Sequence, residues 1–339
     1  MNRLKKLLGH NETYLGAVIV VFALIITIVN PAFIKLDNLF GLMKSSSGTA
    51  ILAIGFLLVL LTGDVDVSAP AIAISAQYIA VNTLIAIDSN SLLLAFVIAI
   101  VVGLVYGAIN AFFITTFKLP ALIVTLGTAN LFHGGLLEFV GTKAVNTGQL
   151  PDAFKVFGHA SIFDLTRADG SSYGLSIFIA VVAVLLLVTW LILRFTLMGR
   201  GIYAIGGDAE SARRAGFNIK RIQYFIYMYV GLLAGIMGIL HISLIRYGNP
   251  NYIVDTELLR VIAAVVLGGA VITGGKGTLV GTILGVTMIT ILEKNLVLIG
   301  LSSYWQQFFV GLIIVVGVAL THIQATLRSH HKVVVIKSQ

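Results

Sequence analysis

The stretch TLMGRGIYAIGGDAESARRAGFNIKRI, residues 196–222, is the only strongly basic polar connection inside a chain that is otherwise almost continuously apolar. Its segment DAESARRAG, residues 208–216, has the pattern of one short helix, with an acidic N-cap, helix-forming residues, two arginines in the last turn and a glycine stop. Such a polar helix between apolar segments predicts an exposed element on which a partner docks.

The composition outside this stretch indicates a polytopic integral membrane protein. Hydrophobic residues make up 58% of the 339 residues, charged residues only 11%, and the mean hydropathy is +1.02, whereas soluble domains contain about 25% charged residues. Because a spanning helix needs about 20 apolar residues, the chain can hold about ten spans. We expect an all-α bundle that forms a single domain over residues 1–339. The apolar runs centre on residues 14–30, 48–62, 69–87, 91–116, 119–140, 174–195, 223–245, 257–272, 277–299 and 303–322.

The positive charges predict how the chain is oriented. The formal net charge is +8, and the basic residues lie in the gaps between apolar runs, which favours a role in membrane topology over a nucleic-acid surface. An even number of spans puts the N-terminus, the 196–222 connection and the tail on one side. The positive-inside rule makes that side cytoplasmic, because the largest basic cluster lies there: Arg194, Arg200, Arg213, Arg214, Lys220 and Arg221. The polar segment 141–173 is then the longest external connection, and it is long enough to form a small cap or a contact surface for an external partner.

Two further features of the sequence narrow the interpretation. The chain contains no cysteine, which excludes disulfides, thiol catalysis and cysteine-ligated metal sites. The first apolar run follows three basic residues and resembles a signal peptide, but Asn30-Pro31-Ala32-Phe33 comes where a cleavage site would lie. We therefore expect an uncleaved first span with a cytoplasmic N-terminus.

Glycines four residues apart predict close packing of several helices. They occur at Gly103 and Gly107, at Gly231 and Gly235, and in the run that begins at Gly277. Small residues at this spacing let helix backbones approach closely in lipid, where packing drives association. The pattern supports a tight bundle but is common to many polytopic proteins.

Two polar, glycine-rich breaks interrupt the apolar runs, at residues 62–70 and 268–277. Non-helical backbone at membrane depth is tolerated only where it lines a cavity or is buried in protein, so each break is a candidate element of a transport path. An ordinary tight hairpin at the membrane surface remains the alternative for each.

The second break contains GGAVITGGKGT, which superficially resembles a phosphate-binding loop. The motif requires glycine at the position of Ala270 and a serine or threonine at the position of Gly277. Its flanks are apolar spans and not a strand. We therefore find no nucleotide-binding site, and any ATP that drives the protein must be hydrolysed by another chain.

Polar residues within the apolar runs are candidates for the path of a solute, because burying a polar group in lipid is costly. Asn130 and His133 lie three apart, hence on one face of a helix, where they could hydrogen-bond a hydroxylated solute. Bonding between neighbouring helices is the alternative role of each such residue. With Asp66 and Ser68 at the first break, the path candidates are Gln77, Asn82, Asn110, Thr125, Thr128, Asn130 and His133. Arg260 is a further intramembrane charge, which could pair with Glu257 one turn earlier.

Two other function classes remain open from the residues alone. In an ion-gradient-driven secondary transporter, Asp64, Asp66, Glu138 and Arg260 would form the coupling relay. A membrane-embedded enzyme is disfavoured, because the sequence has no histidine pair at metal-ligand spacing, no nucleophile motif and no cluster of catalytic carboxylates. Unlike the importer, the secondary transporter would work without an ATPase, so dependence on ATP or on an ion gradient distinguishes the two.

Three stretches closely resemble the ribose-type permeases of bacterial ATP-binding-cassette importers. They are MGRGIYAIGGDAESARRAG at 198–216, AAVVLGG at 263–269 with GGKGTLVGT at 274–282, and KLPALIVTLGT at 118–128. The family serves simple sugars and the related autoinducer-2 signal. In one place the chain departs from the family pattern Gly-Gly-Ile-Asp-Leu-Ser-Val-Gly: it has Asp64 and Pro70 where glycines are usual, and keeps Asp66 and Ser68.

The resemblance implies a multi-pass permease subunit of the bacterial cytoplasmic (inner) membrane, with both termini in the cytoplasm. It implies as partners separate cassette ATPases, a second permease chain, an extracytoplasmic solute-binding protein and membrane lipid. It implies no cofactor or metal in this chain, since ATP and magnesium belong to the ATPase. It also makes 208–216 a cytoplasmic coupling helix that inserts into the ATPase through Asp208, Ala209, Glu210, Ser211, Ala212, Arg213, Arg214, Ala215 and Gly216.

Overall fold

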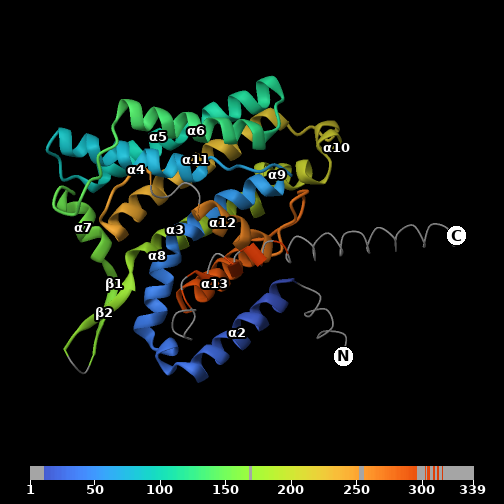
Figure 1. The fold of residues 1–339 in the computed structure, drawn as a ribbon. Coiled ribbons are helices and arrows are strands. Elements are labelled where there is room, and N and C mark those ends of the chain that lie inside the picture. Colours follow the sequence, from blue (N-terminus) through green and yellow to red (C-terminus); the bar gives the residue numbers. More distant parts are fainter. Residues whose placement is uncertain are drawn as a thin grey trace, which may run out of the picture.

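The computed structural model describes residues 11–167, 170–251 and 256–295, together with isolated positions between 302 and 315. Within this part the chain is a bundle of long helices (Figure 1), as predicted from the composition. Seven helices are long and apolar enough to cross a membrane: α2 (Asn11–Val29), α3 (Leu36–Leu61), α4 (Ala69–Ala86), α5 (Leu92–Phe117), α6 (Ala121–Phe139), α8 (Ile177–Phe195) and α11 (Ile219–Ile245). Each overlaps one of the predicted apolar runs, and α3 begins well before its run at 48–62.

Shorter elements connect the long helices. They are η1 (Pro31–Ile34), α7 (Asp152–His159), β1 (Ser161–Thr166), β2 (Ser172–Ser176), α9 (Leu197–Gly207), α10 (Ala209–Arg214), α12 (Thr256–Leu267) and α13 (Leu279–Asn295). The predicted runs 257–272 and 277–299 correspond to α12 and α13, which pack together on either side of the second break. Most of the predicted run 303–322, and the basic residues of both termini, lie outside the described residues.

The helices divide into a buried centre and a periphery. Helices α3, α4 and α11 are buried over most of their apolar length, whereas α2, α5 and α8 bury less than a quarter of theirs. Exposed leucine, valine and phenylalanine side chains on the peripheral helices fit a surrounding of lipid. The central helices therefore carry the residues that are most constrained by packing.

Helices α5 and α11 touch through the two predicted glycine pairs. A Cβ built on Gly103 would lie 2.0 Å from the carbonyl oxygen of Gly231, and one on Gly107 would lie 2.2 Å from that of Tyr227. On the other side, a Cβ on Gly235 would lie 2.3 Å from the Ala99 oxygen. Only glycine permits this backbone contact, which confirms the predicted role of these residues.

The two predicted breaks meet each other and the end of α9. The backbone N–H of Gly275 donates to the carbonyl oxygen of Leu61 at 2.9 Å. A Cβ on Gly206, in α9, would lie 1.8 Å from that same oxygen, and one on Gly274 would lie 2.7 Å from the nitrogen of Gly63. We call Gly63, Gly206, Gly274 and Gly275 the glycine junction. Three of them, Gly63, Gly274 and Gly275, have positive φ angles of 84°, 89° and 74°, which glycine adopts without strain.

The segment 141–173, which the sequence predicts to be external, contains strands that an all-α prediction lacks. Helix α7 is followed by an antiparallel hairpin in which β1 pairs with β2, for example Asp164 opposite Gly174. Arg167, at the end of β1, forms an ion pair with Asp37 in the first turn of α3. The hairpin and α7 lie at one end of the bundle, and α9 and α10 lie at the other (Figure 1).

Candidate functional site

Polar residues gather in pockets at the two ends of the bundle. The α7-side pocket has a volume of about 40 Å³ and is lined by Lys44, Ser45, Gly48, Thr49, Phe178, Met237, Leu240, His241, Leu244 and Glu257. The α10-side pocket is wider, about 410 Å³, and is lined by Asp64, Ile114, Thr115, Lys118, Leu119, Ala209, Glu210, Arg213, Ile219, Lys220 and Gln223. The first lies between α3, α8, α11 and α12, and the second lies between α5, α10 and α11.

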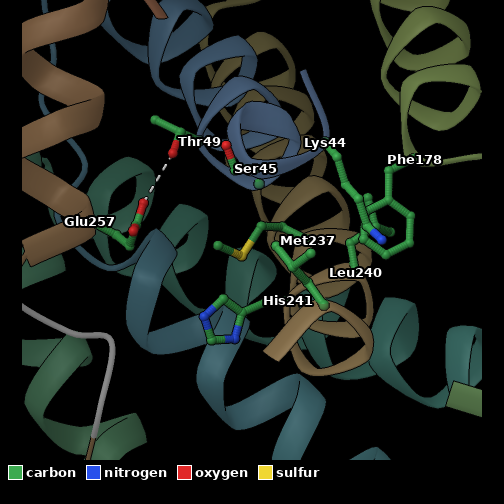
Figure 2. A pocket seen from close by; sticks show the side chains of 10 residues that line it. Lys44, Ser45, Thr49, Phe178, Met237, Leu240, His241 and Glu257 are labelled. Atoms are coloured by element: carbon green, nitrogen blue, oxygen red, sulfur yellow. Dashed lines mark hydrogen bonds between the residues drawn. The ribbon is translucent and has the colours of Figure 1, made fainter. Parts of the chain in front are cut away.

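One wall of the α7-side pocket is an ion-pair cluster. Figure 2 shows Glu257 of α12 facing Thr49 of α3, whose hydroxyl donates to the Glu257 carboxylate at 3.2 Å. Arg260, one turn further along α12, pairs with Glu257 at 2.6 Å, as predicted, and with Glu293 of α13 at 2.7 Å. The two carboxylates and one guanidinium leave this wall with a net negative charge.

The opposite wall carries a positive charge. Lys44 Nζ donates to the carbonyl oxygen of Gly158, in α7, at 2.6 Å and lies 5.8 Å from the centre of the Phe178 ring. Within the described residues Lys44 forms no ion pair with a carboxylate. Because the Lys44 to Gly158 hydrogen bond joins α3 to α7, the pocket lies next to the segment 141–173, which the sequence predicts to be external.

His241 lies between these walls (Figure 2). Its Nδ1 lies 3.2 Å from Oε1 of Gln77, a side chain of α4 that is only 1% exposed. The amide nitrogen Nε2 of Gln77 is buried without a hydrogen-bond partner among the described residues. Gln77, a predicted path candidate, thus lies directly behind the pocket.

Five of the predicted path candidates form one buried network at the first break. Asp66 Oδ1 accepts hydrogen bonds from the Ser68 hydroxyl at 2.6 Å and from the Ser68 N–H at 2.7 Å. Asn110 Nδ2 donates to the Ser68 hydroxyl at 2.7 Å, and the Thr128 hydroxyl donates to Asn110 Oδ1 at 2.6 Å. Thr125 accepts from the Val67 N–H at 3.2 Å. This network connects the break to α5 and α6.

The remaining candidates do not join that network. Asn82 donates to the carbonyl oxygen of Tyr78 and Asn130 to that of Leu126, each at 2.8 Å and within its own helix. His133 Nε2 lies 3.0 Å from the carbonyl oxygen of Pro250. Asn130 is exposed on α6 and His133 is partly buried, and the role of this pair in binding a solute stays a prediction.

The four residues of the alternative coupling relay are not brought together. Asp64 accepts a hydrogen bond from the Tyr227 hydroxyl at 3.4 Å, and Asp66 lies in the buried network. Glu138 is exposed near the far end of α6, and Arg260 is held in the ion-pair cluster of the other pocket. The arrangement gives no support to a relay of these four groups.

Helix α10 follows its sequence pattern closely. Asp208 is the N-cap, and its carboxylate accepts from the Ser211 N–H at 2.5 Å, a hydrogen bond that holds the pKa of Asp208 below its usual value. Glu210 forms ion pairs with Arg213 at 2.5 Å and Arg214 at 3.4 Å. Of the residues 208–216 only Ala212 is buried, so α10 is anchored by one methyl group and exposes its charges.

Several residues of the α7-side pocket were not among the predicted candidates. Lys44, Ser45 and Thr49 belong to α3, which begins at Leu36, while the apolar run predicted its start near residue 48. His241 and Glu257 lie inside or at the edge of predicted spans. The cost of burying a charge in lipid is the signal that would have selected them.

The comparisons with known proteins cover most of the chain. The model of the family described as branched-chain amino acid transport system, permease component, matches residues 38–318. The ribose import permease protein RbsC of Escherichia coli strain K12 is 32% identical over 302 residues, which are 89% of this chain and 90% of that protein. RbsC of Bacillus subtilis strain 168 is 32% identical over 308 residues, with 91% of each chain covered.

A third relative is named for a different solute. The autoinducer 2 import system permease protein LsrC of Enterobacter sp. strain 638 is 31% identical over 314 residues, which are 92% of this chain and 86% of that protein. No solved structure gives a significant match. These findings confirm the resemblance that the three sequence stretches indicated.

Proposed function

The chain belongs to the family of permease components of the branched-chain amino acid transport systems, and from this membership we propose that it forms the solute path of an importer whose ATPase is a separate chain. The relatives are cassette-transporter permeases, which supports this role over an ion-gradient mechanism. We propose a sugar or sugar-like solute, because the compared relatives are named for ribose and autoinducer 2.

The single observation that carries the proposal is the exposed helix α10. Its N-cap is formed, its acidic and basic side chains face outward, and one buried methyl group attaches it to the bundle. A helix with so little packing contributes little to the stability of the fold, so its charged surface is available for a partner. In this proposal α10 inserts into a groove of the ATPase, with Glu210, Arg213 and Arg214 in polar contact.

The orientation of the chain follows from the same helix. If α10 meets a cytoplasmic ATPase, both termini are cytoplasmic, and α7 with the β1–β2 hairpin lies outside. This agrees with the positive-inside rule applied to the 196–222 connection. The hairpin and α7 then offer the external surface for a solute-binding protein, and the protein resides in the bacterial inner membrane.

A second permease chain is supported by the exposed face of α6. Asn130 lies on this face, where lipid would leave its amide poorly satisfied, and Gly127 and Gly134 have open space where a side chain would be. Close approach of another helix at these glycines would cover the amide. The proposed complex therefore contains two permease chains and the ATPases that hydrolyse ATP with magnesium.

Co-purification in mild detergent tests the proposed function. The tagged chain, co-expressed with its neighbouring transport proteins, should retain a cassette ATPase, and the variant Glu210→Ala/Arg213→Ala/Arg214→Ala should lose it. Asp152→Ala/Lys155→Ala is the matched control, because it removes an exposed ion pair of the same i,i+3 spacing from α7 at the other end.

The outcomes separate the alternatives. Loss of the ATPase from the α10 variant alone supports the docking role of α10. Equal loss from both variants indicates general damage to the complex and contradicts that role. A wild-type chain that retains no ATPase while its bundle stays folded contradicts the importer itself.

A further inference from the structure

We propose that the α7-side pocket is a binding site for a neutral polyhydroxylated solute on its way into the path. This inference rests on the proposed function, since it assigns the solute class and the place where the permease first holds it. It concerns residues that were not among the sequence candidates, chiefly Lys44, Thr49, His241 and Glu257.

The hydrogen-bonding groups of the pocket suit hydroxyl groups. A hydroxyl both donates and accepts, so its recognition needs donors and acceptors side by side. The Lys44 ammonium only donates and the Glu257 carboxylate only accepts. The hydroxyls of Ser45 and Thr49 donate to Leu42 oxygen and to Glu257, so they offer acceptor lone pairs to a solute. These side chains surround one space in Figure 2, with His241 between them.

The orientation of His241 adds an acceptor. The Gln77 amide is placed with Oε1 toward Nδ1 of His241, so Nδ1 carries the proton in the neutral ring and Nε2 is an acceptor. Behind it, the Gln77 Nε2 atom is a buried donor without a partner among the described residues.

The charges favour a neutral solute. Glu257 is compensated by Arg260 at 2.6 Å, and Lys44 is held by the Gly158 carbonyl and the Phe178 ring. The lining carries one formal charge of each sign, Lys44 and Glu257, so a net charge on the solute would be attracted by one wall and repelled by the other. Phe178 and Leu240 supply apolar surface for the C–H faces of a sugar.

The pocket must widen to hold such a solute. Its volume of about 40 Å³ accommodates about three water molecules, and a monosaccharide is several times larger. Met237 fills the space opposite Gly48, since a Cβ on Gly48 would lie 3.3 Å from the terminal methyl carbon of Met237. A methionine side chain is flexible and unbranched, so its displacement is the simplest way to enlarge the pocket.

Because the natural chain has no cysteine, a single introduced thiol tests the site directly. The experiment uses the complete transporter in right-side-out vesicles, with Ser45→Cys in the pocket and Ser46→Cys as the control. Ser46 is the next residue of α3, but it lines a different, apolar space between α3, α8 and α13. A charged, membrane-impermeant methanethiosulfonate is added from outside, alone or with D-ribose, D-xylose, D-galactose, D-glucose or L-leucine.

We expect labelling of Ser45→Cys that at least one of the sugars slows by about tenfold when it is present at about ten times its dissociation constant. L-Leucine and the Ser46→Cys control should show no protection. In Ser45→Cys/Met237→Ala, labelling should be faster than in Ser45→Cys, because the pocket is open.

Each other result overturns the inference. Protection by leucine and not by any sugar makes this an amino-acid site. No protection by any sugar, equal protection of Ser46→Cys, or a thiol that reacts only from the inside removes the assignment. Retention of the ATPase in the same preparation distinguishes these failures from failure of the proposed function.

Discussion

Substituting Gly206 by alanine tests whether the glycine junction holds the ends of α3 and α9 together. The added Cβ would lie 1.8 Å from the carbonyl oxygen of Leu61 and 2.3 Å from the nitrogen of Gly275. Carbon and oxygen atoms in contact normally lie about 3.3–3.6 Å apart, so the backbones must separate by more than about 1 Å.

The expected loss of stability can be worked from these contacts. Overpacking of a filled site costs about 1–3 kcal/mol. The separation also breaks the hydrogen bond from Gly275 N–H to Leu61 oxygen, which is 2.9 Å long, and such a bond contributes about 1 kcal/mol. We therefore expect Gly206→Ala to reduce stability by about 2–4 kcal/mol.

The adjacent residue provides the control. Gly207 is also in α9, but its Cβ would meet nothing within 4 Å, so Gly207→Ala should change stability by less than about 0.5 kcal/mol. The measurement is the thermal unfolding midpoint of the purified proteins in one detergent, at one scan rate. If Gly206→Ala unfolds at the wild-type temperature, or if Gly207→Ala loses as much, the junction does not carry the stability assigned to it.

Three further substitutions test the other contacts. Asn110→Ala leaves the Ser68 and Thr128 hydroxyls of the buried network short of a partner and should lower the unfolding temperature, whereas Asn130→Ala on the exposed face should not. Arg260→Met leaves two neighbouring carboxylates uncompensated and should destabilise by about 3–5 kcal/mol, and a wild-type unfolding temperature would contradict the ion-pair cluster. Asp208→Ala should speed hydrogen exchange of the α10 amides. The pKa of Asp208 is lowered in the folded chain, so its cap is complete above about pH 4 and is lost as the pH falls through that lowered pKa. The amides of wild-type α10 should therefore also exchange faster in acid, once the rates are corrected for intrinsic exchange.

The sequence predicts the long helices well because burial in lipid leaves a strong apolar signal. It places the start of α3 too late, because the apolar run begins near residue 48 whereas the helix begins at Leu36. In the structure the hydroxyls of Ser45 and Ser46 donate to carbonyl oxygens of the preceding turn, at 3.0 Å, so the helix continues through them. That error left Lys44 and Ser45 of the α7-side pocket outside the predicted span.

Some of the short polar elements could be predicted from neighbouring residues in the sequence, and others could not. Helix α10 was predictable because its cap and its ion pairs lie within a few residues of one another. Helix α9 was not, because Gly199, Gly201 and Gly206 disfavour a helix by themselves. The close contacts of Gly206 come from Leu61 and Gly275, in distant segments, which a local pattern does not show. The hairpin β1–β2 was also missed, since its strands are short and one of them is mostly exposed.

The candidate site was predicted only in part. The cost of burial in lipid identified Asn110, Thr125 and Thr128, and the polar break at 62–70 identified Asp66 and Ser68; the structure joins all five in one network. The sequence could not show which polar side chains would instead form a hydrogen bond to their own helix, as Asn82 and Asn130 do. That choice depends on rotamers and on neighbouring helices, which a single sequence does not encode locally.

The glycine contact between α5 and α11 divides α11 into two arms of nearly equal length. At 1.5 Å per residue, Gly231 lies about 18 Å from the first residue of the helix and about 21 Å from the last. Gln223 on the first arm lines the α10-side pocket, and His241 on the second lines the α7-side pocket. Pivoting of α11 by about 10° at this contact would carry its ends about 3–4 Å in opposite directions. A motion that widens one pocket would then narrow the other, so a single rigid helix can keep the two sides of the membrane from being open together.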